Sequence, residues 1–210
     1  MLIIGAKGFA KEILEILHKK NETENLYFYD DVNDDIQDFL FGKFKVLKSE
    51  AEAIELFQKT SPEFVIGVGS PKLRRLLFDK FTALGGKCVT IISNNAEVGS
   101  FGNIIENGAI ITSGTIITND VTIRKGTMVN LSCTIGHDSV IGEFVEICPN
   151  VSISGRCVIE DLVFIGTGAT ILPDIKIGKN TIVAAGSVVT KDIPENVLVA
   201  GIPAIIKKEL

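Results

Sequence analysis

The chain has 210 residues, of which 46% are hydrophobic, so it can form two small domains with a sizeable core. Its net charge of −5 argues against nucleic acid or an anionic membrane surface as a main partner. No apolar run approaches the length of a membrane span, and the N-terminal residues are typical of a strand, not of a signal peptide. We therefore expect a folded cytoplasmic protein.

The cysteines and histidines exclude two kinds of site. The four cysteines show no CxxC pairing, and we expect them to be reduced core residues. The only histidines are His18 and His137, too few for a three-histidine zinc site, and no cysteine cluster replaces them. His18 lies within a predicted helix, and we expect it to be a surface residue without a function.

Residues 1–93 alternate short apolar strands with amphipathic helices. The predicted strands are 2–4, 26–29, 44–47, 64–68 and 88–92, and the predicted helices are 11–20, one capped by Ser49, and one ending near Leu84. Glu52 follows Ser49 by three residues, as in a capping box. This alternation predicts a small Rossmann-like domain with a parallel sheet.

Several residues of this domain follow its strands. Gly5 and Gly8 stand between the first strand and the first helix, whose N-terminus could bind an anion. Asp30 follows the second strand, where dinucleotide-binding folds contact a ribose hydroxyl, and Gly69 and Ser70 would lie at the same carboxyl edge. The spacing is GxxGxA and not GxGxxG, so two interpretations remain open: a nucleotide site, or glycines that only permit the turn.

From Ile105 to Val189, every sixth residue is Ile or Val, fifteen times in succession. The residue two positions earlier is mostly small, and Gly often follows the aliphatic residue. A strict period of six predicts a solenoid in which each hexad is a short strand plus a corner. Three hexads form one coil, so we predict a β-helix domain of about five coils across residues 94–190, with the aliphatic side chains at its centre. Residues 191–210 form a tail packed on the last coils.

His137 follows Ile135-Gly136 and therefore occupies a corner of this solenoid. Asp138 follows it directly, and a histidine beside a carboxylate is a suitable general base. Gly155 lies 18 residues further on, so it should stack beside His137 and expose a backbone N–H to a tetrahedral oxyanion. Ser139 faces inward by the pattern, which leaves no nucleophile beside His137. The alternative is that His137 is an ordinary surface residue of a repeat corner.

The chain resembles one family over nearly its full length. The hexads are similar to the hexapeptide repeat of left-handed β-helix acyltransferases, and the left hand is taken from that resemblance. Four segments resemble the bacterial N-acetyltransferases of nucleotide-linked 4-amino-sugars, whose relatives include sialic-acid O-acetyltransferases. They are the turn at 4–8, the Asp30-Asp31 pair, the stretch from Val129 to Gly142, and the tail motif at 199–204.

The resemblance implies a homotrimer that binds acetyl-CoA between neighbouring prisms, and the histidine count above leads us to expect no metal. It implies that His137 is the general base, that Asp138 tunes it, and that Gly155 donates the oxyanion hydrogen bond. The substrate-binding residues that it implies are Gly5, Gly8, Asp30, Asp31, Gly69, Ser70 and Asn130. The residues implied to border CoA are Glu146, Thr167, Ala185, Gly201 and Pro203.

The chain departs from the family pattern at three positions. Glu146 stands where relatives often have a second histidine near CoA, and Phe9 stands where the first turn often has a histidine. Asp138 replaces the glutamate of the closest amino-sugar enzymes.

The expected activity is acetyl transfer from acetyl-CoA to the amine of a nucleotide-linked 4-amino-sugar. Three alternatives remain open at this point. They are O-acetylation of sialic acid or another sugar, a non-catalytic nucleotide-binding trimeric scaffold, and acyl transfer to a different acceptor such as an amino acid.

Overall fold

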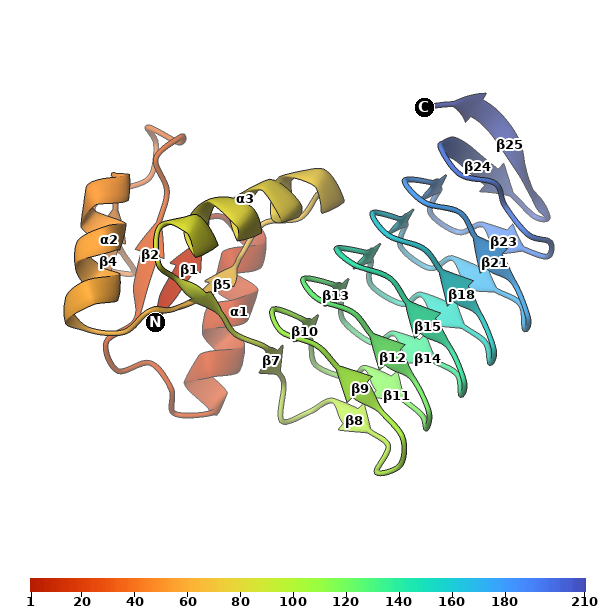
Figure 1. Ribbon diagram of the computed structural model, residues 1–210, viewed down its shortest axis with the longest axis horizontal. Coiled ribbons are helices and arrows are strands. Elements are labelled where there is room, and N and C mark those ends of the chain that lie inside the picture. Colours follow the sequence, from red (N-terminus) through yellow and green to blue (C-terminus); the bar gives the residue numbers. More distant parts are fainter. The chain divides into compact units, whose positions relative to one another are not determined.

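The computed structural model describes all 210 residues and divides the chain into two compact units (Figure 1). The N-terminal unit comprises Met1–Gly69 and Leu73–Ile91, and the second unit comprises Ser70–Lys72 and Ile92–Leu210. None of the helices combines the length and the apolar composition that a membrane span requires.

The N-terminal unit contains a six-stranded sheet with the order β3-β4-β2-β1-β5-β6. Its strands are β1 (Leu2–Ile4), β2 (Tyr27–Tyr29), β3 (Phe39–Leu40), β4 (Phe44–Leu47), β5 (Glu63–Ile66) and β6 (Lys87–Cys88). All neighbours pair in parallel except β3, which pairs antiparallel to β4. The predicted Rossmann-like sheet is confirmed. It is mixed and not wholly parallel, because it includes the two-residue edge strand β3, which was not predicted.

Three helices cover the two faces of this sheet: α1 (Gly8–Lys19), α2 (Glu50–Lys59) and α3 (Pro71–Ala83). Strand residues alternate between the faces. Phe64, Phe57 and Phe81 pack together on the face that α2 and α3 cover. The predicted capping box is confirmed, since Ser49 Oγ accepts a hydrogen bond from Glu52 N–H at 3.3 Å.

The second unit is a left-handed β-helix with three sheets of short strands (Figure 1). The first sheet contains β7 (Ile91–Ile92), β10 (Ile110–Ile111), β13 (Met128–Val129), β16 (Glu146–Ile147), β19 (Phe164–Ile165), β22 (Ile182–Val183), β24 (Val197–Gly201) and β25 (Ala204–Glu209). The second contains β8 (Glu97–Val98), β11 (Ile116–Ile117), β14 (Thr134–Ile135), β17 (Ser152–Ile153), β20 (Thr170–Ile171) and β23 (Val188–Val189). The third contains β9 (Ile104–Ile105), β12 (Thr122–Ile123), β15 (Val140–Ile141), β18 (Val158–Ile159) and β21 (Lys176–Ile177).

Each of the fifteen predicted hexads is one strand, from β9 to β23. Paired strands are one coil apart in the sequence: Ile117 pairs with Ile135, and Ile135 pairs with Ile153. This spacing of 18 residues confirms the predicted coil. The β-helix also extends beyond the hexads, because β7 and β8 precede them and β24 follows them in the first sheet.

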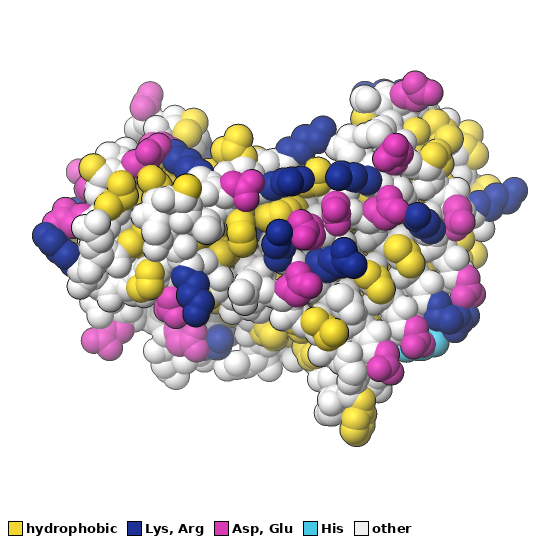
Figure 2. All heavy atoms as spheres, in the orientation of Figure 1, with side chains coloured by type: hydrophobic (Ala, Val, Ile, Leu, Met, Phe, Trp, Pro, Cys, Tyr) yellow, Lys and Arg dark blue, Asp and Glu magenta, His cyan; other side chains and the backbone are white.

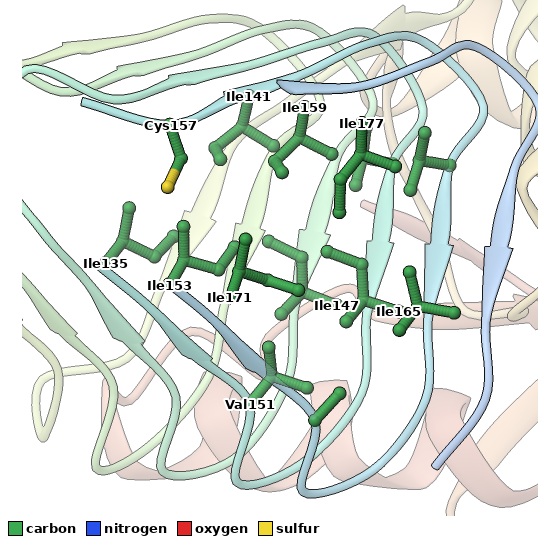
Figure 3. Packing of buried hydrophobic residues seen from close by; sticks show 14 of the residues in the cluster. Ile135, Ile141, Ile147, Val151, Ile153, Cys157, Ile159, Ile165, Ile171 and Ile177 are labelled. Carbon is green, nitrogen blue, oxygen red and sulfur yellow. The ribbon is translucent and has the colours of Figure 1, made fainter. Parts of the chain in front are cut away.

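The repeated aliphatic residues fill the centre of the β-helix. Figure 3 shows rows of isoleucines from different sheets pointing toward one another, such as Ile135, Ile153 and Ile171 in one row and Ile141 and Ile159 in another. All are at most 2% exposed. Burying one such side chain contributes about 1.5–3 kcal/mol, so the repeat itself supplies the stability of this unit.

The small inward residues also make hydrogen bonds. Thr127 Oγ1 donates to Gly142 O at 2.6 Å, and Ser139 Oγ donates to Ser154 O at 3.1 Å. In both pairs the acceptor lies 15 residues further on, in a turn of the next coil. Buried hydroxyls without partners would be costly, so this ladder explains why small polar residues are tolerated inside the prism.

The two ends of the β-helix differ from the prediction. The predicted strand 88–92 is two strands, because β6 belongs to the N-terminal sheet and β7 begins the first sheet of the β-helix. The C-terminal tail packs on the last coils as expected. It does so as a hairpin, in which β24 pairs in parallel with β22 and antiparallel with β25.

Candidate active site

Two edges of the prism carry several of the predicted site residues. The turns between the second and third sheets form the 2–3 edge, which includes residues 136–139, 154–157 and 172–175. The turns between the first and second sheets form the 1–2 edge, which includes residues 130–133, 148–151, 166–169 and 184–187. In each edge, equivalent residues of successive coils lie next to one another.

His137 and Asp138 form a hydrogen-bonded pair at the 2–3 edge. His137 Nδ1 lies 2.6 Å from Asp138 Oδ2, and both side chains are 56% exposed. Asp138 has a φ of 59°, in the left-handed region that Asp tolerates better than most residues. The adjacent pair that the sequence predicts is therefore formed, and it is open to a ligand.

Gly155 lies beside His137 in the next coil, as predicted. Arg156 N–H donates to His137 O at 2.8 Å, which fixes the two turns against each other. A Cβ at Gly155 would lie 2.8 Å from both Cε1 and Nε2 of His137. The imidazole ring therefore occupies the space that any side chain at this position would need. The Gly155 N–H donates to no acceptor in the chain.

This geometry assigns roles to the two ring nitrogens of His137. A carboxylate only accepts hydrogen bonds, so the neutral imidazole carries its proton on Nδ1 toward Asp138. The lone pair is then on Nε2, on the side of Gly155. The corner can consequently accept a proton at Nε2 close to a free backbone donor, which is what a general base beside an oxyanion site requires.

An ion pair next to this corner was missed in the sequence analysis. Arg156 donates two hydrogen bonds to Asp174, from Nε at 2.6 Å and from Nη2 at 2.9 Å. The guanidinium holds the pKa of the Asp174 carboxyl below its ordinary value. Opposite charges separated by one coil length were the available signal, because residues 18 apart lie side by side at an edge.

Neither Ser139 nor any of the cysteines is placed to act as a nucleophile beside His137. Ser139 is fully buried and donates into the coil, as predicted. All four cysteines are free thiols, and Cys133 and Cys157 fill inward positions. Burial raises the pKa of Cys133 to about 11 and that of Cys148 to about 12. These thiols are therefore protonated and unreactive at neutral pH.

Four of the residues predicted to border CoA come together along the 1–2 edge. Thr167 and Ala185 occupy successive coils, and Gly186 N–H donates to Thr167 O at 2.9 Å. Gly201 N–H donates to Ser187 Oγ at 3.2 Å, which brings the turn containing Pro203 to the same edge. Asn130 also lies at the 1–2 edge, whereas His137 lies at the 2–3 edge. Within a single chain, Asn130 is therefore not beside His137. Its predicted role stays a prediction.

Glu146 lies in strand β16 of the first sheet and not at the 1–2 edge. Its side chain is buried, and Oε2 accepts a hydrogen bond from Ser70 N–H at 2.7 Å. Both residues line a cavity of about 390 Å³, together with Phe164 and Ile182. The structure thus gives Glu146 an internal partner and separates it from the other four CoA candidates, and its role at CoA stays a prediction.

In the N-terminal unit, the first turn and the loop after β5 meet at the carboxyl edge of the sheet, as predicted. Gly5 N–H donates to Tyr29 O at 2.8 Å, and Gly67 N–H donates to Ile4 O at 2.7 Å. Gly5 has a φ of 102°, and a Cβ there would lie 2.8 Å from Val68 Cγ1. Gly5 is thus required by the turn, whereas a Cβ at Gly8 would meet nothing within 4 Å.

The Asp30 carboxylate is occupied within its own loop. Asp30 is 6% exposed, and Oδ1 accepts hydrogen bonds from Val32 N–H at 3.3 Å and from Asn33 N–H at 3.0 Å. The Asn33 side-chain amide donates to both carboxylate oxygens. In the structure, the Asp30 carboxylate holds the loop after β2 together. Its predicted role in binding a ribose stays a prediction.

Asp31 is also engaged inside the unit. Tyr29 Oη donates to Asp31 Oδ2 at 2.7 Å, and Lys80 Nζ lies 3.6 Å from the same oxygen and 3.0 Å from Glu50. Burial and the Asp31 hydrogen bond raise the pKa of Tyr29. This cluster connects the end of β2 with α2 and α3, and the role of Asp31 in substrate binding stays a prediction.

The side chains on the surface carry no dominant charge. Figure 2 shows Lys and Arg side chains interspersed with Asp and Glu, and no large area of one sign on the visible face. His18 is exposed near the end of α1, as predicted, and its backbone carbonyl accepts a hydrogen bond from Asn21 N–H at 3.0 Å.

Two family models match the chain. Residues 1–81 match the PglD N-terminal domain, and residues 156–191 match the bacterial transferase hexapeptide, a model of six repeats. The two matches fall in the two units, and the second covers the turns that contain Arg156 and Thr167.

Three similar proteins cover nearly the whole chain. GDP-perosamine N-acetyltransferase of Escherichia coli O157:H7 is 30% identical over 96% of this chain and 93% of its own length. Galactoside O-acetyltransferase of Lactococcus lactis is 28% identical over 92% of this chain and 87% of its own length. The crystal structure of PerB from Caulobacter crescentus, in complex with CoA and GDP-perosamine, has a TM-score of 0.89 and 28% identity, and covers 99% of this chain and 96% of that one.

Proposed function

Because the chain belongs to the PglD-like family of hexapeptide-repeat acetyltransferases, we propose that it transfers an acetyl group from acetyl-CoA to the amine of a nucleotide-linked 4-amino-sugar. Two of the similar proteins support the acceptor class, since their names specify N-acetylation of perosamine or a complex with GDP-perosamine. The N-terminal unit supplies the nucleotide site in this proposal, and the β-helix supplies the acetyl-CoA site.

The observation that carries the proposal is the position of the His137 ring over Gly155. Its Nδ1 is held by Asp138 at 2.6 Å, and its Nε2 lies 2.8 Å from the position of a Cβ built on Gly155. A general base, an orienting carboxylate and a free N–H donor are the minimum that direct aminolysis of a thioester requires.

The proposed reaction has no covalent enzyme intermediate. The sugar amine attacks the thioester carbonyl carbon, and His137 Nε2 accepts the proton that the amine releases. Gly155 N–H donates to the oxyanion of the tetrahedral intermediate. The C–S bond then breaks, and His137 returns the proton to the departing thiolate, which leaves as CoA. Asp138 stabilises the imidazolium and keeps the ring oriented.

We also propose that the protein works as a homotrimer. His137 and Gly155 lie at the 2–3 edge, whereas Thr167, Ala185 and Gly201 lie at the 1–2 edge. One chain thus separates the proposed base from the proposed CoA contacts. In a cyclic assembly, the 2–3 edge of one protomer can face the 1–2 edge of its neighbour and complete the site.

The proposal is tested by acetyl transfer and thermal shift with UDP-, GDP- and dTDP-linked 4-amino-sugars, each with acetyl-CoA. We expect turnover with one of these nucleotides and its loss in His137→Ala. A protein that is stabilised by CoA but acetylates none of the nucleotide sugars would contradict the proposed acceptor class. Absence of CoA binding would instead favour a non-catalytic scaffold.

A second candidate function is O-acetylation of a sugar hydroxyl. It is favoured by the similarity to the Lactococcus lactis protein, whose name specifies O-acetylation of galactosides. The same corner could deprotonate a hydroxyl. Turnover of a galactoside or of free sialic acid, with none for any nucleotide amino-sugar, would favour this candidate.

A further inference from the structure

Arg74 is the largest fully buried side chain of the protein. It lies in the first turns of α3 and is 0% exposed. Removing a guanidinium from water is costly unless its hydrogen bonds are made inside the protein. A hydrophobic residue of similar size could fill the same core position without this cost. The hydrogen bonds of Arg74 therefore indicate what the guanidinium does there.

The Arg74 side chain binds the backbone just after strand β5. Nη1 donates to Ile66 O at 3.3 Å and to Val68 O at 3.1 Å. Ile66 is the last residue of β5, and Val68 lies two residues further along. One guanidinium nitrogen therefore bridges two alternate carbonyls, which point the same way in an extended chain, and holds this segment extended beyond the end of the strand.

The geometry of the peptide bond fixes what points in the other direction. In a trans peptide, the C=O of one residue and the N–H of the next point to opposite sides. Ile66 O points to Arg74, and Gly67 N–H accordingly points away from it and donates to Ile4 O at 2.7 Å. By the same rule, the bond from Arg74 to Val68 O turns Gly69 N–H away from the guanidinium.

Gly69 N–H is thereby aimed at the side of the first turn. Unlike Gly67 N–H, it donates to no acceptor in the chain. The first turn packs directly against this loop, because a Cβ at Gly5 would lie 2.8 Å from Val68 Cγ1 and 3.0 Å from Gly67 O. The space around Gly8, at the start of α1, is open.

We propose that Arg74 is a positioning residue for the nucleotide. It holds the Val68–Gly69 peptide with its N–H toward the Gly5–Gly8 turn, as a fixed donor to an acceptor oxygen of a nucleoside diphosphate. Arg74 does not contact the ligand, because it is buried on the other side of the loop. This inference rests on the proposed function. It adds a residue that orients the nucleotide site without contacting the nucleotide.

The test measures nucleotide affinity by calorimetry in full-length Arg74→Met, which keeps the volume and removes the donors. We use UDP, GDP and dTDP as probes and follow whichever binds the wild type. R74M should weaken binding by roughly 10- to 100-fold, the range for loss of a hydrogen bond to a charged acceptor. The affinity for acetyl-CoA should not change. If R74M does not unfold cooperatively, Arg74→Gln takes its place.

Phe81→Leu is the matched control, since it loosens the same helix without touching the loop carbonyls. F81L should lower the melting temperature and keep the nucleotide affinity. Gly69→Pro removes the proposed donor directly, and R74M added to G69P should cause no further loss if both act through one N–H.

Three results would overturn the inference. The first is a folded R74M that binds nucleotide like the wild type. The second is an equal loss of affinity in R74M and F81L, which would mean a merely structural role. The third is additive losses in the R74M–G69P double variant. A wild-type protein that binds no nucleoside diphosphate would instead refute the proposed nucleotide site, and this inference with it.

Discussion

The β-helix and the N-terminal unit use the same kinds of residue at the ends of their strands, but with opposite outcomes. In the β-helix, His137 and Asp138 are exposed and bind each other, and Gly155 leaves room for the ring. In the N-terminal unit, Asp30 and Asp31 also follow a strand, yet their carboxylates are occupied by protein groups. Residue type and position identified both pairs, but only the hydrogen-bond partners distinguish a free site from an internal contact.

The largest expected effect concerns the exposed pair. Replacing His137 by Ala should lower kcat by roughly 10²–10⁴, the range for loss of a general base, without lowering stability. CoA binding should persist, because the His137 side chain is 56% exposed and the proposed CoA contacts lie at the other edge of the prism. Steady-state kinetics and calorimetry check this, with His18→Ala as the control. Wild-type turnover in H137A would remove His137 from the mechanism.

Gly155→Ala tests the same corner by steric displacement. The added Cβ would need the space of the His137 ring, which is 2.8 Å away, so the ring must move. Misplacement of a catalytic group by about 1 Å costs on the order of 10² in rate, and we expect kcat to fall by that factor. Ser154→Ala, one residue earlier, should keep kcat. Equal kinetics for the two variants would contradict the proposed stacking role.

In the interior of the β-helix, stability should depend on the isoleucine rows. Ile147→Ala should destabilise this unit by about 2–5 kcal/mol, and Ile147→Val by about 0.5–1.5 kcal/mol. Hydrogen exchange should show faster opening of β-helix peptides and little change in peptides from Met1–Gly69. Loss of protection in both units alike would mean that the two unfold as one.

Asp30→Ala is the converse experiment in the N-terminal unit. The substitution removes a carboxylate that accepts hydrogen bonds from Val32 N–H, Asn33 N–H and the Asn33 side chain, which should cost about 1–3 kcal/mol. Protection in peptides around residues 26–40 should fall, while the β-helix is unaffected. If D30A instead abolishes nucleotide binding in a unit of unchanged stability, Asp30 acts on the ligand and not on the loop.

The smallest expected effect is a pH dependence at the start of α2. Hydrogen bonds from Lys48 N–H and neighbouring groups lower the pKa of Glu52 from its ordinary value. Because its pKa is depressed, the Glu52 carboxylate contributes stability that is fully present above its unfolded-state pKa, near 4.5. This stability is lost as the pH falls through the folded-state pKa. The melting temperature of Glu52→Gln should therefore lie slightly below that of the wild type at pH 7, and the difference should shrink as the pH falls below 4.5.

The sequence was most informative where the structure repeats. A six-residue period gave the coil length, the inward residues and the stacking of His137 on Gly155, because equivalent residues must lie side by side in a solenoid. The same arithmetic could have found the Arg156–Asp174 pair. It also places Asn130 one hexad before His137, and therefore at a different edge of the prism, which the sequence analysis did not take into account.

Where the chain does not repeat, tertiary contacts decided the details. Nothing in the local sequence of Arg74 distinguishes it from the exposed Arg75 beside it, because burial depends on how α3 lies on the sheet. The hydrogen bond from Ser70 N–H to Glu146 is likewise a long-range contact that no sequence period predicts.

The central claim is that this corner acetylates an amine carried by a nucleotide sugar. The most direct measurement is a competition in which acetyl-CoA is offered with equal amounts of a nucleotide-linked 4-amino-sugar, its 4-hydroxy counterpart and a free galactoside. The products are then identified by mass spectrometry and NMR. We predict acetylation only at the 4-amino nitrogen of the nucleotide sugar. An acetyl group on either hydroxyl compound, with the amine unmodified, would contradict the claim.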